Sequence, residues 1–168
     1  MSWIAWAVTG AIVVILLLWG VAIYNGLVRL RALVKEGFSG ITVQLRRRAD
    51  LIPNLVSTVE GYATHERETL TQVIAHRGDA VNAKGVAATA QADTAMSAMI
   101  GKLFAVAEAY PDLKANANFQ QLQAELSEIE ETLQSSRRYY NATVRDLNTS
   151  IQSFPNVLFA RPLGFHEE

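Results

Sequence analysis

The stretch WIAWAVTGAIVVILLLWGVAI, residues 3–23, is an almost unbroken apolar run, and no charged side chain occurs from Met1 to Val28. As a helix this run is about 31 Å long, close to the thickness of the hydrocarbon core of a bilayer. A cleaved signal peptide would need a basic segment before the run and a small-residue cleavage site after it, and the sequence has neither. The run therefore predicts a retained, single-pass transmembrane anchor.

The basic residues after the run predict its orientation. Arg29, Arg31 and Lys35 follow it closely, whereas no charge precedes it. Because an excess of Lys and Arg marks the cytoplasmic side of a span, we expect the amino terminus outside and the rest of the chain in the cytoplasm.

Outside the anchor the composition is that of a soluble domain. We divide the chain into an anchor with a short external amino terminus (residues 1–28), a cytoplasmic helical domain (29–153) and a carboxyl-terminal tail (154–168). The overall charge does not favour nucleic acid as a partner. The 15 basic and 16 acidic residues leave a net charge of -1, so the chain has no strong positive electrostatic field. The lack of cysteine removes disulfide and thiol chemistry.

A seven-residue repeat predicts one long helix in the carboxyl-terminal half. The repeat consists of Phe119, Leu126, Leu133, Tyr140, Leu147 and Phe154. The second apolar position of the repeat holds Leu122 and Ile129 at first. In the later repeats the same position holds the polar residues Ser136, Thr143 and Ser150. The repeat is typical of a coiled-coil-like seam, and Asn118 with Gln121 is spaced as a capping box at its start.

Other segments also have helical periodicity. One continues the anchor to about Leu45, although residues 37–40 weaken it with two glycines. A second is expected to begin at Leu51 with Asp50 as its N-cap, because Pro53 is tolerated only in the first turn of a helix. Residues 78–89 are small and polar and predict a loop.

The remaining apolar segment completes an all-α fold. Met96 to Val106 predicts a third helix that Tyr110-Pro111 ends, and strand patterns are absent. We expect the N-terminal transmembrane helix to continue into a long antiparallel four-helix bundle. The last helix is longer than the cytoplasmic part of the first. We therefore expect either that the bundle tilts from the bilayer, or that the tail 154–165 lies against the membrane surface or a neighbouring subunit.

Several short motifs follow one another along the chain. They are Tyr24-Asn25-x-Leu27-Val28, Gln44-Leu45-x-Arg47-Arg48-x-Asp50-Leu51-Ile52-Pro53-Asn54, Glu60-Gly61-Tyr62-Ala63, Glu108-Ala109-Tyr110-Pro111-Asp112-Leu113-Lys114-Ala115-Asn116, Arg137-Arg138-x-Tyr140-Asn141 and Phe154-Pro155. In this order they resemble the LemA family of bacterial membrane proteins. The resemblance implies one anchor in the bacterial cytoplasmic (inner) membrane and a helical bundle in the cytoplasm. The chain departs from the family pattern at residues 37–40, where a Trp-containing, helix-favouring stretch is more usual.

The sequence lacks the motifs of the catalytic and metal sites that we considered. His65-Glu66 begins like a zinc-peptidase motif, but Thr69 stands where the second histidine ligand would be. A di-iron site in a bundle would need Glu-x-x-His repeats, which the sequence lacks. We expect no metal, no cofactor and no enzymatic activity.

Eleven polar or corner residues are candidates for interaction instead. They are Arg46, Arg47, Arg48, Asp50, Tyr110, Pro111, Asp112, Lys114, Asn116, Tyr140 and Asn141. For the three arginines we weigh binding of an anion against ion pairs with Asp50, Asp112 or the acidic group at 125–131, and favour the ion pairs. The corner at 110–116 is either a packed connection or a partner-binding loop.

The sequence thus predicts a membrane-anchored helical scaffold. It would act by self-association into a homo-oligomer or by holding other membrane proteins, with the lipid bilayer as its other partner. The alternative is a signalling or stress-response component whose bundle changes conformation. The polar residues in the second half of the last helix would permit such a change, because they pack less tightly than apolar ones.

Overall fold

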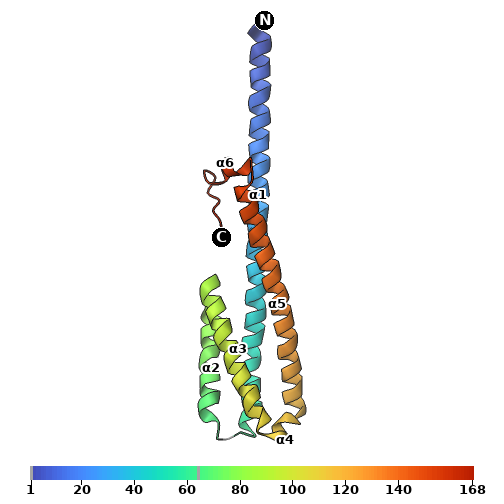
Figure 1. Ribbon diagram of the computed structural model, residues 1–168, viewed down its shortest axis with the longest axis vertical. Coiled ribbons are helices and arrows are strands. Elements are labelled where there is room, and N and C mark those ends of the chain that lie inside the picture. The colour runs from blue at the N-terminus through green and yellow to red at the C-terminus, as the bar shows by residue number, and fades with distance from the viewer. Residues whose placement is uncertain (1, 64) are drawn as a thin grey trace. The chain divides into compact units, whose positions relative to one another are not determined.

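The computed structural model describes residues 2–63 and 65–168, and within these ranges it contains helices and no strand (Figure 1). The helices are α1 (Ser2–Glu60), α2 (Arg67–Asn82), α3 (Val86–Glu108), α4 (Pro111–Lys114), α5 (Ala117–Gln152) and α6 (Asn156–Ala160). The prediction of an all-helical protein is confirmed. Met1, the first residue of the expected anchor, and Thr64 lie outside the described residues.

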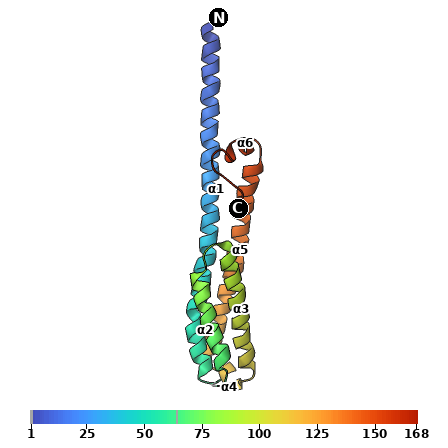
Figure 2. The same cartoon turned by 90° about the vertical axis from the view of Figure 1, so that its left-hand side faces the viewer.

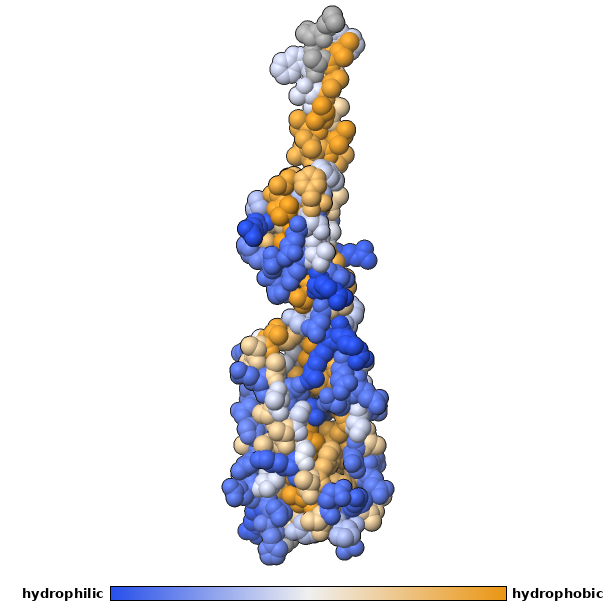
Figure 3. Space-filling view, in the orientation of Figure 1, coloured by the Kyte–Doolittle hydropathy of each residue, from blue (hydrophilic) through white to orange (hydrophobic). Residues whose placement is uncertain are grey.

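The start of α1 is the apolar segment from which the sequence predicts an anchor. Of the described helices, α1 is the one long and apolar enough to cross a membrane, by length and composition. Its large side chains point outward, and Trp6 and Leu18 are 78% and 66% exposed. Figure 3 shows this end of α1 mostly orange. An apolar surface of this kind is consistent with an anchor surrounded by lipid.

The helix α1 continues without a break to Glu60, so the boundary expected at Asp50 is wrong. Pro53 lies inside the helix and has no N–H to donate to the carbonyl of Ala49. The Nε of Arg77 donates to that carbonyl instead, at 3.0 Å. Because a side chain replaces the missing donor, the helix passes through the proline, and Asp50 is not an N-cap.

The chain forms two compact units. The anchor unit consists of Met1–Gly37 and Arg138–Glu168, and the core unit is Phe38–Arg137. Both α1 and α5 contribute to each unit. The division expected at residues 28 and 153 follows composition rather than packing and stays a prediction.

The core unit is built on one buried apolar cluster. Its helices lie side by side in both views of the ribbon (Figures 1 and 2). The cluster consists of Ile52, Leu55, Val56, Val59, Ala63, Leu70, Val73, Met96, Ile100, Leu103, Ala107, Leu113, Phe119, Leu122 and Leu126. Apart from Ala63, which lies between α1 and α2, and Leu113 of the short α4, these residues come from α1, α2, α3 and α5 and recur at helical spacing, so each of these four helices buries one stripe of its surface.

The connection between α2 and α3 is shorter than the sequence predicts. The loop expected at 78–89 is confined to residues 83–85, because α2 extends to Asn82 and α3 begins at Val86. Gly85 precedes α3 with a φ of 81°, a backbone conformation that favours glycine. One positive-φ glycine therefore replaces a longer loop.

The start of α5 is also displaced from its predicted position. The side-chain oxygen of Asn116 accepts a hydrogen bond from the backbone N–H of Phe119 at 3.1 Å. The capping box expected at Asn118 is wrong by two residues, since Asn118 lies inside the first turn of α5. The short helix α4, which Pro111 begins, brings Asn116 to the capping position.

In the anchor unit, the tail packs on α1 and α5. A second buried cluster consists of Ile23, Leu27, Val34, Leu147, Ile151, Ala160 and Phe165. The rings of Tyr24 and Phe165 meet edge to face, with centroids 5.7 Å apart. Asn148 and Glu168 exchange two hydrogen bonds of 2.9 and 3.1 Å. These contacts hold residues 160–168 beside the helix pair.

A glycine permits the close approach of α1 and α5 in this unit. A Cβ placed on Gly37 would lie 3.1 Å from the Cα of Tyr140 and 3.4 Å from the hydroxyl of Thr143. The sequence suggests that this glycine weakens α1, but α1 is helical there, and the missing side chain makes room for the backbone of α5.

Candidate functional site

A buried network of charged side chains is the most concentrated polar feature of the core unit. The Nη1 of Arg48 lies 3.1 Å from Asp93 Oδ1 and 3.1 Å from Glu130 Oε2. It also donates to the hydroxyl of Ser97 at 3.0 Å. Arg137 pairs with the other oxygen of Asp93 and lies 4.0 Å from Glu130 Oε1. The network joins α1, α3 and α5.

Burial differs within the network. The side chains of Arg48 and Asp93 are each 8% exposed, whereas those of Glu130 and Arg137 are partly open to solvent. Burial lowers the pKa of the Arg48 guanidinium, because desolvation disfavours its charged form, and the nearby Glu130 carboxylate acts in the opposite direction. Two cations therefore face two anions, with Arg48 and Asp93 shielded from water and Glu130 and Arg137 at the solvent-facing edge.

A network of this kind is better suited to hold the helices in one alignment than to bind a ligand. Its formal charges sum to zero, so no charge is left to recruit an anion or cation. Removal of one member would leave a buried charge uncompensated, which is costly. We therefore interpret these side chains as a device that fixes how α1, α3 and α5 align.

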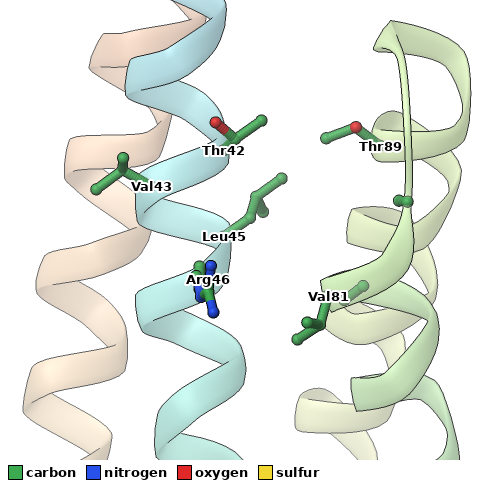
Figure 4. Close-up of a pocket in the computed structure, with 8 residues that line it drawn as sticks. Thr42, Val43, Leu45, Arg46, Val81 and Thr89 are labelled. Atoms are coloured by element: carbon green, nitrogen blue, oxygen red, sulfur yellow. The ribbon is translucent and has the colours of Figure 1, made fainter.

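A groove lies in the same unit, where α1 faces the α2–α3 corner (Figure 4). Its volume is about 210 Å³. It is lined by Thr42, Val43, Leu45, Arg46, Ala80, Val81, Ala83 and Thr89. Figure 4 shows Thr42 and Leu45 extending from α1 toward the segment that carries Val81 and Thr89. Val43 and Val81 are more than two-fifths exposed, so the groove offers apolar as well as basic surface.

The three consecutive arginines lie in different surroundings. Arg48 is buried in the network, Arg46 lines the groove, and Arg47 is exposed. Asp50 is exposed and pairs with Arg77 at 3.5 Å, and not with the arginines next to it in sequence. The favoured interpretation, an ion-pair network, thus describes Arg48 with one member of the acidic group at 125–131.

The corner at residues 110–116 is held by its own contacts. Tyr110 packs against the apolar cluster, and Pro111 begins α4. Lys114 pairs with Glu108 at 2.7 Å, and the amide of Asn116 donates to the hydroxyl of Tyr62 at 2.9 Å. Asp112 is exposed. These contacts are those of a packed connection; a partner-binding role for this corner stays a prediction.

Tyr140 and Asn141 belong to the anchor unit. Tyr140 packs against the second apolar cluster and Asn141 is exposed. Burial raises the pKa of the Tyr140 hydroxyl, and the negative charge of Glu168 raises it further. Tyr140 is therefore a packed side chain with a protonated hydroxyl at neutral pH.

Sequence reasoning missed Asp93, Ser97, Arg137 and Arg77 as members of polar contacts. A signal for Asp93 was present. It stands on the stripe that also carries Thr89, Met96, Ile100 and Leu103, all on the buried face of α3. A carboxylate on a stripe of that kind needs a cation from another helix. The partner itself was not readable, because Arg48 and Arg137 lie far away in sequence.

Among residues 2–63 and 65–168, no group of three or more His, Cys, Asp or Glu side chains is arranged to hold a metal ion. His76 lies 3.4 Å from Asp79, one turn along α2. This pair is local to a helix surface.

Comparison with known proteins gives the family. A model of the LemA family matches residues 37–168. The chain is also similar to "Protein LemA" of Metamycoplasma hominis, with 26% identity over 143 residues, covering 84% of this chain. It spans 65% of the length of that relative. Since the family match extends over most of the chain, this protein belongs to the LemA family.

Proposed function

We propose that this protein is a membrane-anchored helical scaffold, without enzymatic activity, that acts through self-assembly or protein interaction at the inner face of the bacterial membrane. The observation that carries the proposal is α1 itself. One uninterrupted helix has lipid-compatible side chains at its start and contributes Ile52, Leu55 and Val59 to the apolar core at its end. The anchor and the folded core therefore share one element.

The core unit has the organisation of an antiparallel four-helix bundle in this proposal. Support comes from the single apolar cluster to which α1, α2, α3 and α5 all contribute. The connections at residues 61–66, 83–85 and 109–116 are short. Short connections favour antiparallel neighbours.

The groove of the core unit is the surface that supports a scaffold role. Val43 and Val81 flank it, and Arg46 adds a positive charge at its edge. Apolar side chains with an adjacent arginine are a common composition of protein interfaces. We propose that a second copy of the chain, or another protein, contacts the core unit here.

The topology belongs to the same proposal. Arg29, Arg31 and Lys35 come directly after the apolar segment, which supports a cytoplasmic position for everything that follows it. The amino terminus would then be external, and the membrane would be the cytoplasmic one.

A second candidate function is a membrane-linked signalling or stress-response component. The observation in its favour is the polar content of the packed face of α5: Thr143 is buried, and Ser136 and Ser150 are half-buried. Faces held by polar contacts can have more than one arrangement of similar energy, which a conformational switch requires.

The decisive experiment is the mass of the full-length chain, extracted in mild detergent and measured by native mass spectrometry. A scaffold is expected to give a discrete mass well above 18.5 kDa, either a multiple of the chain or the chain with a partner. A lone 18.5 kDa chain under all extraction conditions would contradict the proposal.

The groove can be tested separately by cross-linking in the membrane. The chain has no cysteine, so Val43→Cys introduces a single thiol at the groove. Oxidation is expected to link this thiol across copies if the groove mediates self-assembly. Ser127→Cys, exposed on α5, is the matched control and should link much less. Equal linkage of the two variants would exclude a specific contact at the groove.

A further inference from the structure

The tail around α6 exposes large apolar side chains. Phe154 and Leu158 are 79% and 61% exposed, and Val157, Phe159 and Leu163 are also open to solvent. Five such residues within ten positions are unusual on a surface that faces only water, and groups of this kind mark contact sites for membranes or proteins.

The tail lies beside the last turns of the apolar segment of α1. The ring of Phe165 packs on Tyr24, and Ala160 belongs to the same buried cluster as Ile23. Asn156, at the start of α6, lines a cavity together with Trp19 and other residues of α1. All these contacts lie within the anchor unit, so they fix α6 at the level of Trp19 to Tyr24.

This level is where the apolar segment ends. Trp and Tyr side chains concentrate at the interface between hydrocarbon and headgroups. If residues 3–23 cross the membrane, α6 lies at the headgroup boundary. Figure 3 shows orange side chains over α6 next to the orange end of α1, so the apolar surface continues from the anchor onto the tail.

Two exposed arginines near residues 154–163 fit a phospholipid surface, whereas the acidic Glu167 and Glu168 lie outside that segment. Arg161 directly follows α6 and is exposed, and Arg29 is exposed on the turn of α1 just after the apolar segment. Short segments that combine apolar side chains with flanking arginines bind at the boundary between acyl chains and anionic headgroups.

We propose that residues 154–163 form a second membrane contact, in which Phe154, Leu158 and Leu163 insert into the headgroup and upper acyl region of the bilayer that α1 crosses. This inference rests on the proposed anchoring by α1. The tail thus adds an in-plane contact to the transmembrane one and limits the tilt of the anchor unit from the bilayer normal.

The test is a depth measurement on the full-length protein in vesicles of phosphatidylcholine and phosphatidylglycerol. Because the chain has no cysteine, single variants can be spin-labelled at one site each. The variants are Leu158→Cys for the tail, Glu167→Cys as an exposed control on the same tail, and Val13→Cys for the anchor. Collision of the label with oxygen, which concentrates in lipid, is compared with collision with a water-soluble nickel chelate.

The inference predicts that the labels at 158 and 13 collide more with oxygen and that the label at 167 collides more with nickel. A label at 158 that collides mainly with nickel, while the label at 13 reports lipid, would overturn the tail contact and leave the anchor intact. A label at 158 shielded from both reagents would also overturn it, since the tail would then be covered by protein. A label at 13 in water would refute the anchoring as well.

Discussion

The Nε of Arg77 donates to the carbonyl oxygen of Ala49 at 3.0 Å, and this is the carbonyl that Pro53 leaves without its helical donor. A residue of α2 therefore completes the backbone hydrogen bonding of α1. The same guanidinium lies 3.5 Å from the carboxylate of Asp50. One side chain thus stabilises a proline position that would otherwise favour a break in α1.

Replacement of Arg77 by alanine is expected to lower the free energy of unfolding by about 1–2 kcal/mol, because a buried carbonyl loses its donor. In a Pro53→Ala background, the N–H of residue 53 can bond to Ala49, so the same replacement should cost about 1 kcal/mol less. Urea unfolding of the four chains, followed by circular dichroism, measures the difference. An equal cost in both backgrounds would show that Arg77 acts in some other way.

Gly37→Ala is expected to destabilise the anchor unit by about 1–3 kcal/mol, because the new Cβ would press against the backbone of Tyr140. Gly26→Ala is the matched control. Nothing lies within 4 Å of its Cβ, so alanine should stabilise the helix there by about 0.5–1 kcal/mol. Thermal unfolding in mild detergent distinguishes opposite shifts for the two variants. Stabilisation by both would mean that the helices can separate without cost.

Asp93→Asn removes the carboxylate that both Arg48 and Arg137 contact. We expect a loss of about 3 kcal/mol, since Arg48 is then buried next to Glu130 alone. Asp79→Asn on the surface of α2 should change the free energy of unfolding by less than about 0.5 kcal/mol. Chemical unfolding checks both values. If the two variants were equally mild, the network would contribute little to the fold.

Asn116→Ala should destabilise the chain by about 1 kcal/mol, because the N–H of Phe119 loses its cap. Asn118→Ala, two residues later, tests the cap position expected from sequence and should have almost no effect. The two alanine variants lie two positions apart, one just before α5 and one in its first turn, and can be compared in the same unfolding assay. A larger loss of stability in Asn118→Ala than in Asn116→Ala would show that Asn118 is the N-cap, as the sequence predicts.

The hydroxyl of Tyr140 gives a prediction in alkaline solution. Burial and Glu168 raise its pKa above the ordinary value of 10.0. The folded state then holds this proton more tightly than the unfolded state. Its contribution to stability is complete below about pH 10 and is lost as the pH rises through the folded-state pKa.

The check is the difference in free energy of unfolding between the natural chain and Tyr140→Phe, measured at about pH 8 and about pH 11. The natural chain should lose more stability than the variant on going to the higher pH. Tyr139→Phe, whose ring is exposed, serves as the control. Parallel losses in the natural chain and Tyr140→Phe would exclude a role for this hydroxyl.

Sequence periodicity predicts the helices of this protein well and their ends less well. The heptad positions Phe119, Leu126 and Leu133 are buried, as predicted. A seven-residue apolar repeat places its side chains on one face of a helix, and that face is the one covered by neighbouring helices. Phe154 continues the repeat but is exposed, since α5 ends at Gln152.

The errors share a physical origin. The rule that proline ends a helix is local, whereas the donor that rescues Pro53 comes from α2. The glycine at position 37 has low helix propensity, but the backbone that it accommodates belongs to α5. Likewise, the triple-arginine motif did not identify Asp93 as the partner of Arg48. In each case the missing information is a contact between helices, which single-helix propensities do not contain.

The burial of the Arg48–Asp93 pair determines how the core unit responds to changes in ionic strength. Arg48 and Asp93 are paired at 3.1 Å with little solvent around them, so dissolved ions cannot enter to screen the pair. Exposed pairs such as Lys114 with Glu108 weaken as ionic strength rises, but the alignment of α1, α3 and α5 does not depend on them. The core unit is therefore suited to keep one helix register through osmotic changes that alter the salt content of its compartment.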